Sequence, residues 1–222
     1  QVEDAGAWDA WARWYEALER RARGLTESAA EVPLVSLDGA ALALDPIAGE
    51  RFRDERFRRF LGAVLAADWL TYASPDERVA FGQLCFTLDR FPSGFRVWFA
   101  RVEGALMPVG YSAWHPIDVA TWRRFETHDP PWRDRALVSL TRAQEGDYLY
   151  LFNYSVLAPW RRGEGSRALL RGLAQDVAKV SPRGLVAITV SGDGARVAGR
   201  FGLAPRGEIT VGESREEIWM TQ

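Results

Sequence analysis

The residues between Tyr148 and Arg167 have the types and the order of an anion-binding site. An apolar run with strand character, Tyr148–Leu157, leads through Gly163 and Gly165 into a segment with helical periodicity. The first backbone N–H groups of a helix have no partner inside it, and the helix dipole favours negative charge there. Three arginines add charge suited to a phosphate: Arg161, Arg162 and Arg167. The sequence therefore predicts a phosphate cradle at the end of a strand.

Three polar residues interrupt the apolar strand before the cradle: Asn153, Tyr154 and Ser155. In a regularly alternating strand Tyr154 shares a face with Tyr150 and Val156, and Asn153 shares the other face with Ser155. An unpaired polar group in a buried strand costs about 1–3 kcal/mol. Two interpretations follow: these side chains form hydrogen bonds within the core, or Asn153 or Tyr154 faces a reaction centre.

His115 is the candidate general base, because histidine titrates near neutral pH. It ends a predicted strand just before Pro116, and the chain has one other histidine, His128. A structural or merely exposed histidine is the alternative. No Gly-x-Ser-x-Gly motif indicates a serine hydrolase, and no spacing of His, Asp or Glu indicates a metal site.

The cradle sequence Pro159–Gly165, followed by Ala168-Leu-Leu, resembles the acyl-CoA-binding motif of the GNAT N-acyltransferases. That motif runs Arg or Gln, two residues, Gly, one residue, and then Gly or Ala. Arg162 and Gly165 fit its first two positions, and Arg167 occupies the third.

Two more segments are similar to elements of that family, in the family's order: a hairpin at residues 99–114 and a helix with its following turn at residues 196–203. The resemblance spans residues 95–222 and implies an α/β fold, with a mixed, mostly antiparallel sheet flanked by helices. It also implies an acyl-CoA or acetyl-CoA donor. In the family the strand before the cradle splays from its neighbour and holds the pantetheine arm, which places Val156 and Leu157 nearest the thioester.

The candidate site divides into a catalytic and a cofactor-binding set. The catalytic candidates are His115, Asn153 and Tyr154. The resemblance implies that the cofactor is held by Val156, Leu157, Arg161, Arg162, Gly163, Glu164, Gly165, Ser166, Arg167 and Ser191.

Two positions depart from the family pattern. Members often carry a tyrosine, as general acid, four residues before the glycine of a Gly-Phe pair; counting back from Gly202 gives Ala198, which has no proton to donate. An asparagine that often contacts the cofactor is replaced by Ser191. Either another residue supplies the proton, or the chain binds an acyl carrier without the usual turnover.

The elements that must position these residues fall into two parts: a helical N-terminal extension over residues 1–75, packed on a core over residues 76–222. The first 25 residues carry one apolar helical stripe, formed by Trp8, Trp11, Tyr15, Leu18, Ala22 and Leu25. We expect this helix to dock on its own domain; a partner groove or a membrane surface is the alternative. Glu50–Tyr72 is predicted to be a second helix, with Phe57, Leu61, Val64, Leu65 and Trp69 facing inward.

Further elements follow from local patterns. We predict a short strand or an extended link at Val32–Leu37. We predict strands at Gln83–Leu88, Phe95–Val102, Val109–Trp114, Tyr148–Leu157, Leu185–Val190, Ile209–Val211 and Ile218–Thr221. We predict helices at Thr121–Thr127, Ser166–Val180 and Arg196–Phe201, and a turn at Gly192–Gly194. Asp129-Pro-Pro131 should end the first of these helices, and the long interval before Tyr148 is expected to be a lid or an insertion.

Composition excludes several classes of protein. The 222 residues, 47% of them hydrophobic, are enough for a substantial core. A net charge of −2 argues against a general nucleic-acid binder. The single cysteine, Cys85, excludes an internal disulfide. The sequence shows neither an apolar run long enough for a membrane span nor a signal peptide, so we expect a cytoplasmic protein.

The leading functional hypothesis is transfer of an acyl group from acyl-CoA, or from the pantetheine arm of an acyl carrier protein, to an amine of a small molecule, peptide or protein. A long-chain acyltransferase of the toxin-activating or lipopeptide-modifying type is one alternative. A non-catalytic acyl-CoA-binding module is the other, motivated by Ala198. A homodimer is left open.

Overall fold

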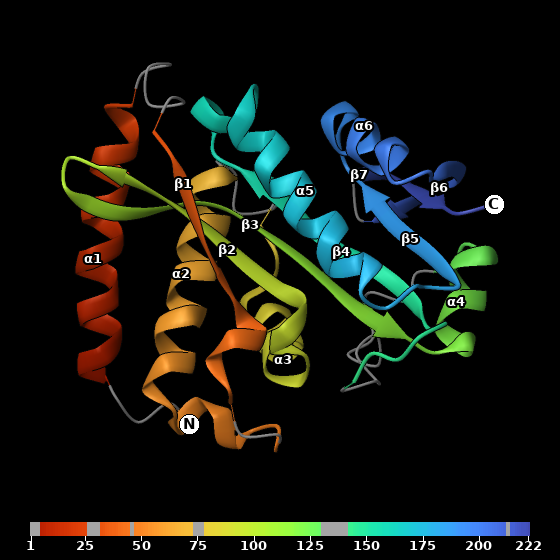
Figure 1. Cartoon of the computed structure of the whole chain (residues 1–222), viewed down its shortest axis with the longest axis horizontal. Coiled ribbons are helices and arrows are strands. Elements are labelled where there is room, and N and C mark those ends of the chain that lie inside the picture. The colour runs from red at the N-terminus through yellow and green to blue at the C-terminus, as the bar shows by residue number, and fades with distance from the viewer. Residues whose placement is uncertain (1–4, 26–31, 45–46, 73–77, 130–141, 212–213) are drawn as a thin grey trace.

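A mixed sheet of seven strands organises the described part of the chain, in the order β1-β2-β3-β4-β5-β7-β6 (Figure 1). The computed structural model describes residues 5–25, 32–44, 47–72, 78–129, 142–211 and 214–222. The strands are β1 (Leu34–Asp38), β2 (Phe95–Val102), β3 (Ala105–Ile117), β4 (Tyr148–Val156), β5 (Gly184–Thr189), β6 (Ala204–Val211) and β7 (Ser214–Met220). All neighbours pair antiparallel except β4 and β5, which are parallel.

Six α-helices flank this sheet in the described residues. They are α1 (Ala5–Arg23), α2 (Glu55–Thr71), α3 (Phe81–Arg90), α4 (Val119–Glu126), α5 (Glu164–Ala178) and α6 (Gly192–Arg200). The prediction of an α/β fold, with a mostly antiparallel sheet flanked by helices, is confirmed.

The two faces of the sheet carry different helices (Figure 1). On one face, Gly172 of α5 lies so close to Trp98 of β2 that a Cβ atom there would come within 2.6 Å of the ring. On the other face, the Tyr111 hydroxyl of β3 donates a hydrogen bond of 2.8 Å to Asp68 of α2. We call these the α5 face and the α2 face. A ligand on one face is separated by the sheet from the side chains on the other face.

Helices α6 and α4 extend this arrangement over the C-terminal strands. A Cβ atom on Gly199 of α6 would lie 4.0 Å from Trp219 of β7, on the α5 face. On the α2 face, Phe125 of α4 packs against Tyr150 of β4, with ring centroids 5.4 Å apart. Because α4 lies between β3 and β4 in sequence, the first part of the predicted insertion covers the sheet. Residues 130–141, including Pro130 and Pro131, lie outside the described residues.

Helix α1 docks on α2, as its apolar stripe predicts. The Trp11 indole N–H donates to the carbonyl of Gly62 at 3.1 Å, and Trp11 packs edge-on against Trp69 with centroids 5.3 Å apart. Leu18 of the same stripe is buried. None of the described helices has the length and the apolar character needed to cross a membrane.

The N-terminal region contributes to the sheet itself. Strand β1 pairs with β2 along its whole length, from Leu34↔Ala100 to Asp38↔Arg96. The Arg96 guanidinium donates to Asp38 at 2.8 Å and to Asp176 of α5 at 2.7 Å. A division of the chain at residue 75 therefore passes between elements that share one sheet.

Two local predictions are wrong. The expected strand Gln83–Leu88 is part of helix α3, because Leu84 and Leu88, one turn apart, are both buried against the sheet. The expected turn Gly192–Gly194 is the first turn of α6, because the Ser191 hydroxyl accepts a hydrogen bond of 3.2 Å from the Gly194 N–H and caps the helix.

Candidate active site

Strands β4 and β5 part in the middle of the sheet. They pair only from Tyr148↔Gly184 to Leu151↔Ala187, after which β4 continues to Val156 without β5. A bulge lies at the same level: Trp114 faces Leu151 and Ala113 faces Asn153, which leaves Phe152 unpaired. The backbone groups of β4 beyond the bulge that point towards β5 therefore have no strand partner. An extended polar ligand can take that place.

The direction of these backbone groups follows from the hydrogen bonds at the end of β4. The Leu157 N–H donates to Val109 of β3 at 2.7 Å, so Leu157 is turned away from the gap. Groups alternate along an antiparallel pair, which turns those of Val156 and Tyr154 towards the gap. Consistent with this, the Val156 carbonyl accepts a hydrogen bond of 2.9 Å from Arg161. Of the two residues expected nearest the thioester, Val156 presents its backbone to the gap and Leu157 does not.

The cradle is the first turn of α5. Its N-cap, Gly163, has φ 92° and ψ −153°, a conformation that only glycine adopts readily. The Arg167 N–H closes the first turn on the Gly163 carbonyl at 3.3 Å. The N–H groups of Glu164, Gly165 and Ser166 lie before that bond, where a helix has no internal acceptors for them. These three N–H groups have the arrangement expected of the predicted anion site.

The three arginines of the cradle have different partners. Arg161 is turned back onto the ends of β4 and α2, donating to Val156 and, at 3.2 Å, to the Thr71 carbonyl. Arg167 forms an ion pair of 3.0 Å with Glu164. Arg162 is exposed and forms neither an ion pair nor a hydrogen bond within the described part of the chain. Arg162 is thus the cation left for a ligand.

The bulge at Phe152 changes which polar residues share a face. Tyr150 pairs with His115 and lies on the α2 face, whereas Tyr154 lies on the α5 face. The expectation that Tyr150 and Tyr154 share a face is therefore wrong, because the extra residue shifts the alternation. The Tyr154 hydroxyl donates to the Ser166 carbonyl at 2.8 Å, which ties β4 to the cradle.

Asn153 and Ser155 lie on the α2 face, beyond the bulge. The Asn153 Oδ1 and Ser155 Oγ atoms are buried and have no hydrogen-bond partner among the described residues. A buried polar atom of this kind costs about 1–3 kcal/mol until something satisfies it. Asn153 therefore offers an acceptor beside the gap, on the side opposite the cradle.

His115 is fully buried, with 0% of its surface exposed. Its Nδ1 lies 3.3 Å from the carbonyl of the neighbouring Pro116, and its ring packs against Tyr150 with centroids 5.3 Å apart. Burial lowers the pKa of the His115 imidazole to about 4. The side chain is thus a neutral core residue that solvent does not reach, which argues against the role of base.

Ser191 and Ala198 hold structural positions on α6. The Ser191 hydroxyl caps the helix, and Ala198 is buried with its carbonyl accepting from the Leu203 N–H at 3.3 Å. Glu216 of β7 is a half-buried carboxylate that the sequence analysis did not single out. It alternates with Ile218 and Met220, both buried, and this pattern was the available signal that Glu216 faces inward.

Comparisons with known proteins identify the fold. No protein-family model matches the chain, and no curated protein matches its sequence. Solved structures do match: the NatC complex bound to Gag peptide and CoA has a TM-score of 0.54, with 10% identity over 85% of this chain and 97% of that one. Naa50 of Arabidopsis thaliana, in complex with the bisubstrate analogue CoA-Ac-MVNAL, has a TM-score of 0.51, with 10% identity over 86% and 99%.

A third match is the polyamine N-acetyltransferase of Drosophila melanogaster, which catalyses the formation of N-acetylagmatine. Its TM-score is 0.51, with 12% identity over 86% of this chain and 100% of that one. At such low identity the likeness is one of fold. The chain has the fold of the GNAT acetyltransferases along nearly the whole length of these neighbours.

Proposed function

We propose that the protein is an N-acyltransferase that moves an acyl group from acyl-CoA to an amine. The observation that carries this proposal is the combination of the parted strands β4 and β5, the bulge at Phe152 and the glycine-capped start of α5. Together they form a slot for an extended arm that ends at a diphosphate cradle. Neighbours of the same fold were crystallised with CoA or a CoA bisubstrate analogue, which supports the same donor here.

The residues present fit this substrate. The diphosphate would accept hydrogen bonds from the N–H groups of Glu164, Gly165 and Ser166, with Arg162 adding charge. The pantetheine amides would pair with the backbone of Tyr154 and Val156, as a strand would. The thioester would then lie near the bulge at the level of Phe152. The amine would approach from the α2 face, where the Asn153 Oδ1 atom lies beside the gap without a hydrogen-bond partner among the described residues.

The cradle also fits the family motif in a different register. Gly163 and Gly165 have the Gly-x-Gly spacing, and Gly163 has the conformation that needs glycine. In this register Trp160 occupies the Arg or Gln position, and Arg167 no longer stands where a small residue is expected. We propose this register in place of the one that begins at Arg162.

The proposal is tested by measuring binding and turnover separately. Isothermal titration should detect binding of CoA and acetyl-CoA. Incubation of an acyl-CoA with a panel of primary amines should release free CoA thiol, and mass spectrometry should detect the amide. Binding without thiol release for any amine or acyl length would identify a non-catalytic module. Absence of binding would overturn the proposal.

We expect Gly163→Ala to weaken CoA binding by about 1–3 kcal/mol, because an alanine at φ 92° is strained and the first turn would rotate its N–H groups away from the phosphate. The measurement is titration calorimetry. Gly104→Ala is the matched control, since Gly104 also has a positive φ and open space but lies in the β2–β3 hairpin. If both variants bind CoA like the parent, the cradle does not hold the phosphates.

A further inference from the structure

Glu216 is a half-buried carboxylate on β7, close to the gap between β4 and β5. Strand β7 pairs with β5 from Val186↔Met220 to Thr189↔Glu217. It therefore runs along the part of β5 that has left β4. Glu216 is the β7 residue next to Glu217, just beyond the last of these pairs, and it pairs with Ile209 of β6.

The strand register places Glu216 on the α2 face. Val186 pairs with Tyr150 on one side and with Met220 on the other, so these three side chains share a face. Steps of two residues along β7 put Ile218 and then Glu216 on that same face. This is the side of the gap from which the amine would approach.

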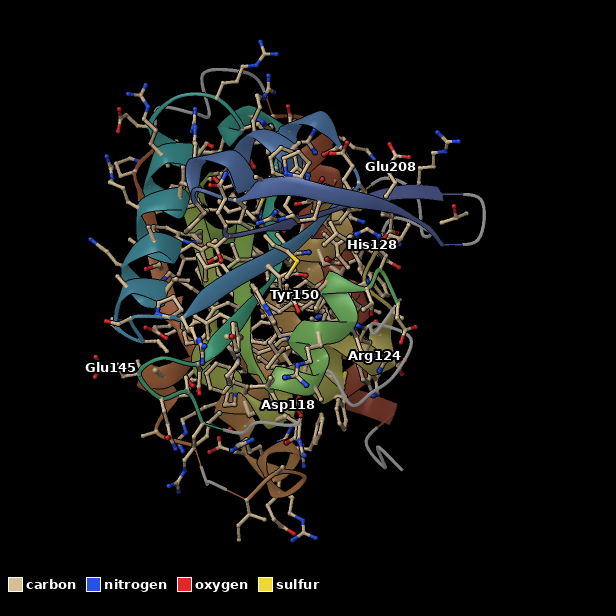
Figure 2. All side chains as sticks on the ribbon, turned by 90° about the vertical axis from the view of Figure 1, so that its right-hand side faces the viewer. Asp118, Arg124, His128, Glu145, Tyr150 and Glu208 are labelled. Carbon is tan, nitrogen blue, oxygen red and sulfur yellow. The ribbon has the colours of Figure 1, made fainter. Side chains whose placement is uncertain are left out.

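The Glu216 carboxylate lies near Tyr150 of β4. Burial and, after it, the negative charge of Glu216 raise the pKa of the Tyr150 hydroxyl, an effect that requires the two groups to lie near each other. Burial also raises the pKa of the Glu216 carboxyl itself, which makes it a stronger base than an exposed glutamate. In Figure 2 Tyr150 lies in the middle of this side, between helix α4 and the C-terminal strands.

Glu216 has no hydrogen bond or ion pair among the described residues, unlike Glu208 and Glu217 of the same two strands. Glu217 accepts the Trp219 indole N–H at 3.0 Å on the opposite face. Glu208, which Figure 2 shows out on the hairpin, lies 3.7 Å from Arg215. Glu216 is thus the carboxylate of β6 and β7 that is free to take a proton at the gap.

Two other buried acid–base groups on the α2 face are closed off. His115 is enclosed in the core, as described above. Asp68 is also fully buried, and its two oxygens accept from the Tyr111 hydroxyl at 2.8 Å and from the Val79 N–H at 3.3 Å. Neither can meet an amine that enters from solvent.

We propose that Glu216 is the general base that deprotonates the acceptor ammonium at the gap, an inference that rests on the acyl transfer proposed above. The ammonium gives one proton to the Glu216 carboxylate and becomes a neutral amine. Its nitrogen attacks the thioester carbonyl, so that a C–N bond forms and the C–S bond breaks with its electron pair on sulfur. The second nitrogen proton passes to the thiolate, giving amide and free CoA, and Glu216 later releases its proton to water. A carboxylate here also favours a cationic amine over a neutral alcohol.

We expect Glu216→Gln to lower kcat for an alkylamine about 10²–10⁴-fold, the usual contribution of a general base, with an unchanged Kd for acyl-CoA. Glu216→Asp should recover part of the rate. Glu217→Gln is the matched control. A glutamine at position 217 can still accept the Trp219 indole N–H, so this variant should keep the parental kcat.

A second acceptor distinguishes proton removal from other roles of Glu216. This acceptor is an amine whose ammonium pKa lies below the assay pH, so that it binds in its neutral form and needs no base. The Gln variant should lose less than about 10-fold with such an amine, since a missing base then matters little. Equal losses with both amines would mean that Glu216 positions the acceptor and is not the base, and an unchanged kcat would remove it from the site; either outcome overturns the proposal. A parent protein that binds no CoA or releases no thiol would instead refute the acyltransferase proposal itself.

Discussion

Replacing Trp160 by alanine is expected to lower the free energy of unfolding by about 3–5 kcal/mol, the range for truncating a buried tryptophan. Trp160 is 0% exposed and ends the short turn Ala158–Trp160 that leads from β4 to α5. It belongs to the same buried cluster as Val156 and Leu169, and a Cβ atom on Gly165 would lie only 2.8 Å from its ring. The Trp160 side chain thus packs against the first turn of α5, which forms the cradle. Its loss should therefore weaken CoA binding as well as stability.

Urea denaturation of the Trp160 variant, with titration of CoA under folding conditions, measures both effects. Trp160→Phe should lose less, because it keeps most of the volume and removes an indole N–H that has no partner among the described residues. Trp14→Ala is the control for an exposed tryptophan, 38% accessible, and should change stability by less than about 0.5 kcal/mol. A Trp160→Ala variant as stable as the parent would contradict the packing seen here.

The cradle could be predicted from the sequence because it is a local feature. A strand, a glycine turn and a helical period all lie within twenty residues of Tyr148 in the sequence, and each has a short-range signal. Which of the two glycines caps the helix could not be predicted from the sequence. Gly163 and Gly165 are two residues apart, and only the backbone angles show that Gly163 caps the helix while Gly165 packs on Trp160.

The acceptor side could not be predicted in the same way, because it depends on a bulge and on burial. Strict alternation places Tyr150 and Tyr154 together, and the one unpaired residue at Phe152 separates them. His115 looks like a base by its type, yet its burial is set by helices far away in sequence. Glu216 had a local signal in its alternation with Ile218 and Met220, but its nearness to Tyr150 depends on three strands meeting.

Between pH 4 and pH 6.5 two buried groups should change the stability in opposite directions. Burial lowers the pKa of His115 from 6.5 to about 4, so the unfolded chain binds a proton that the folded protein refuses. This contribution lowers stability as the pH falls through that window. Burial raises the pKa of Asp68 from 3.8 to about 6, against the hydrogen bonds from Tyr111 and Val79. The folded protein then keeps a proton that the unfolded chain releases, so this contribution lowers stability as the pH rises.

Each shift spans about two pH units, which corresponds to about 3 kcal/mol at most. We therefore expect the stability of the parent relative to His115→Gln to fall by about 2–3 kcal/mol from pH 7 to pH 4. Relative to Asp68→Asn, the parent should lose a similar amount as the pH rises from about 3.5 to 7. Urea denaturation at half-unit pH steps measures both differences. A packing cost of the substitution is the same at every pH. Only the change with pH of the stability difference between parent and variant therefore tests the prediction. A flat difference for His115→Gln would mean that its imidazole is open to solvent in the folded protein, and His115 would then return as a candidate base.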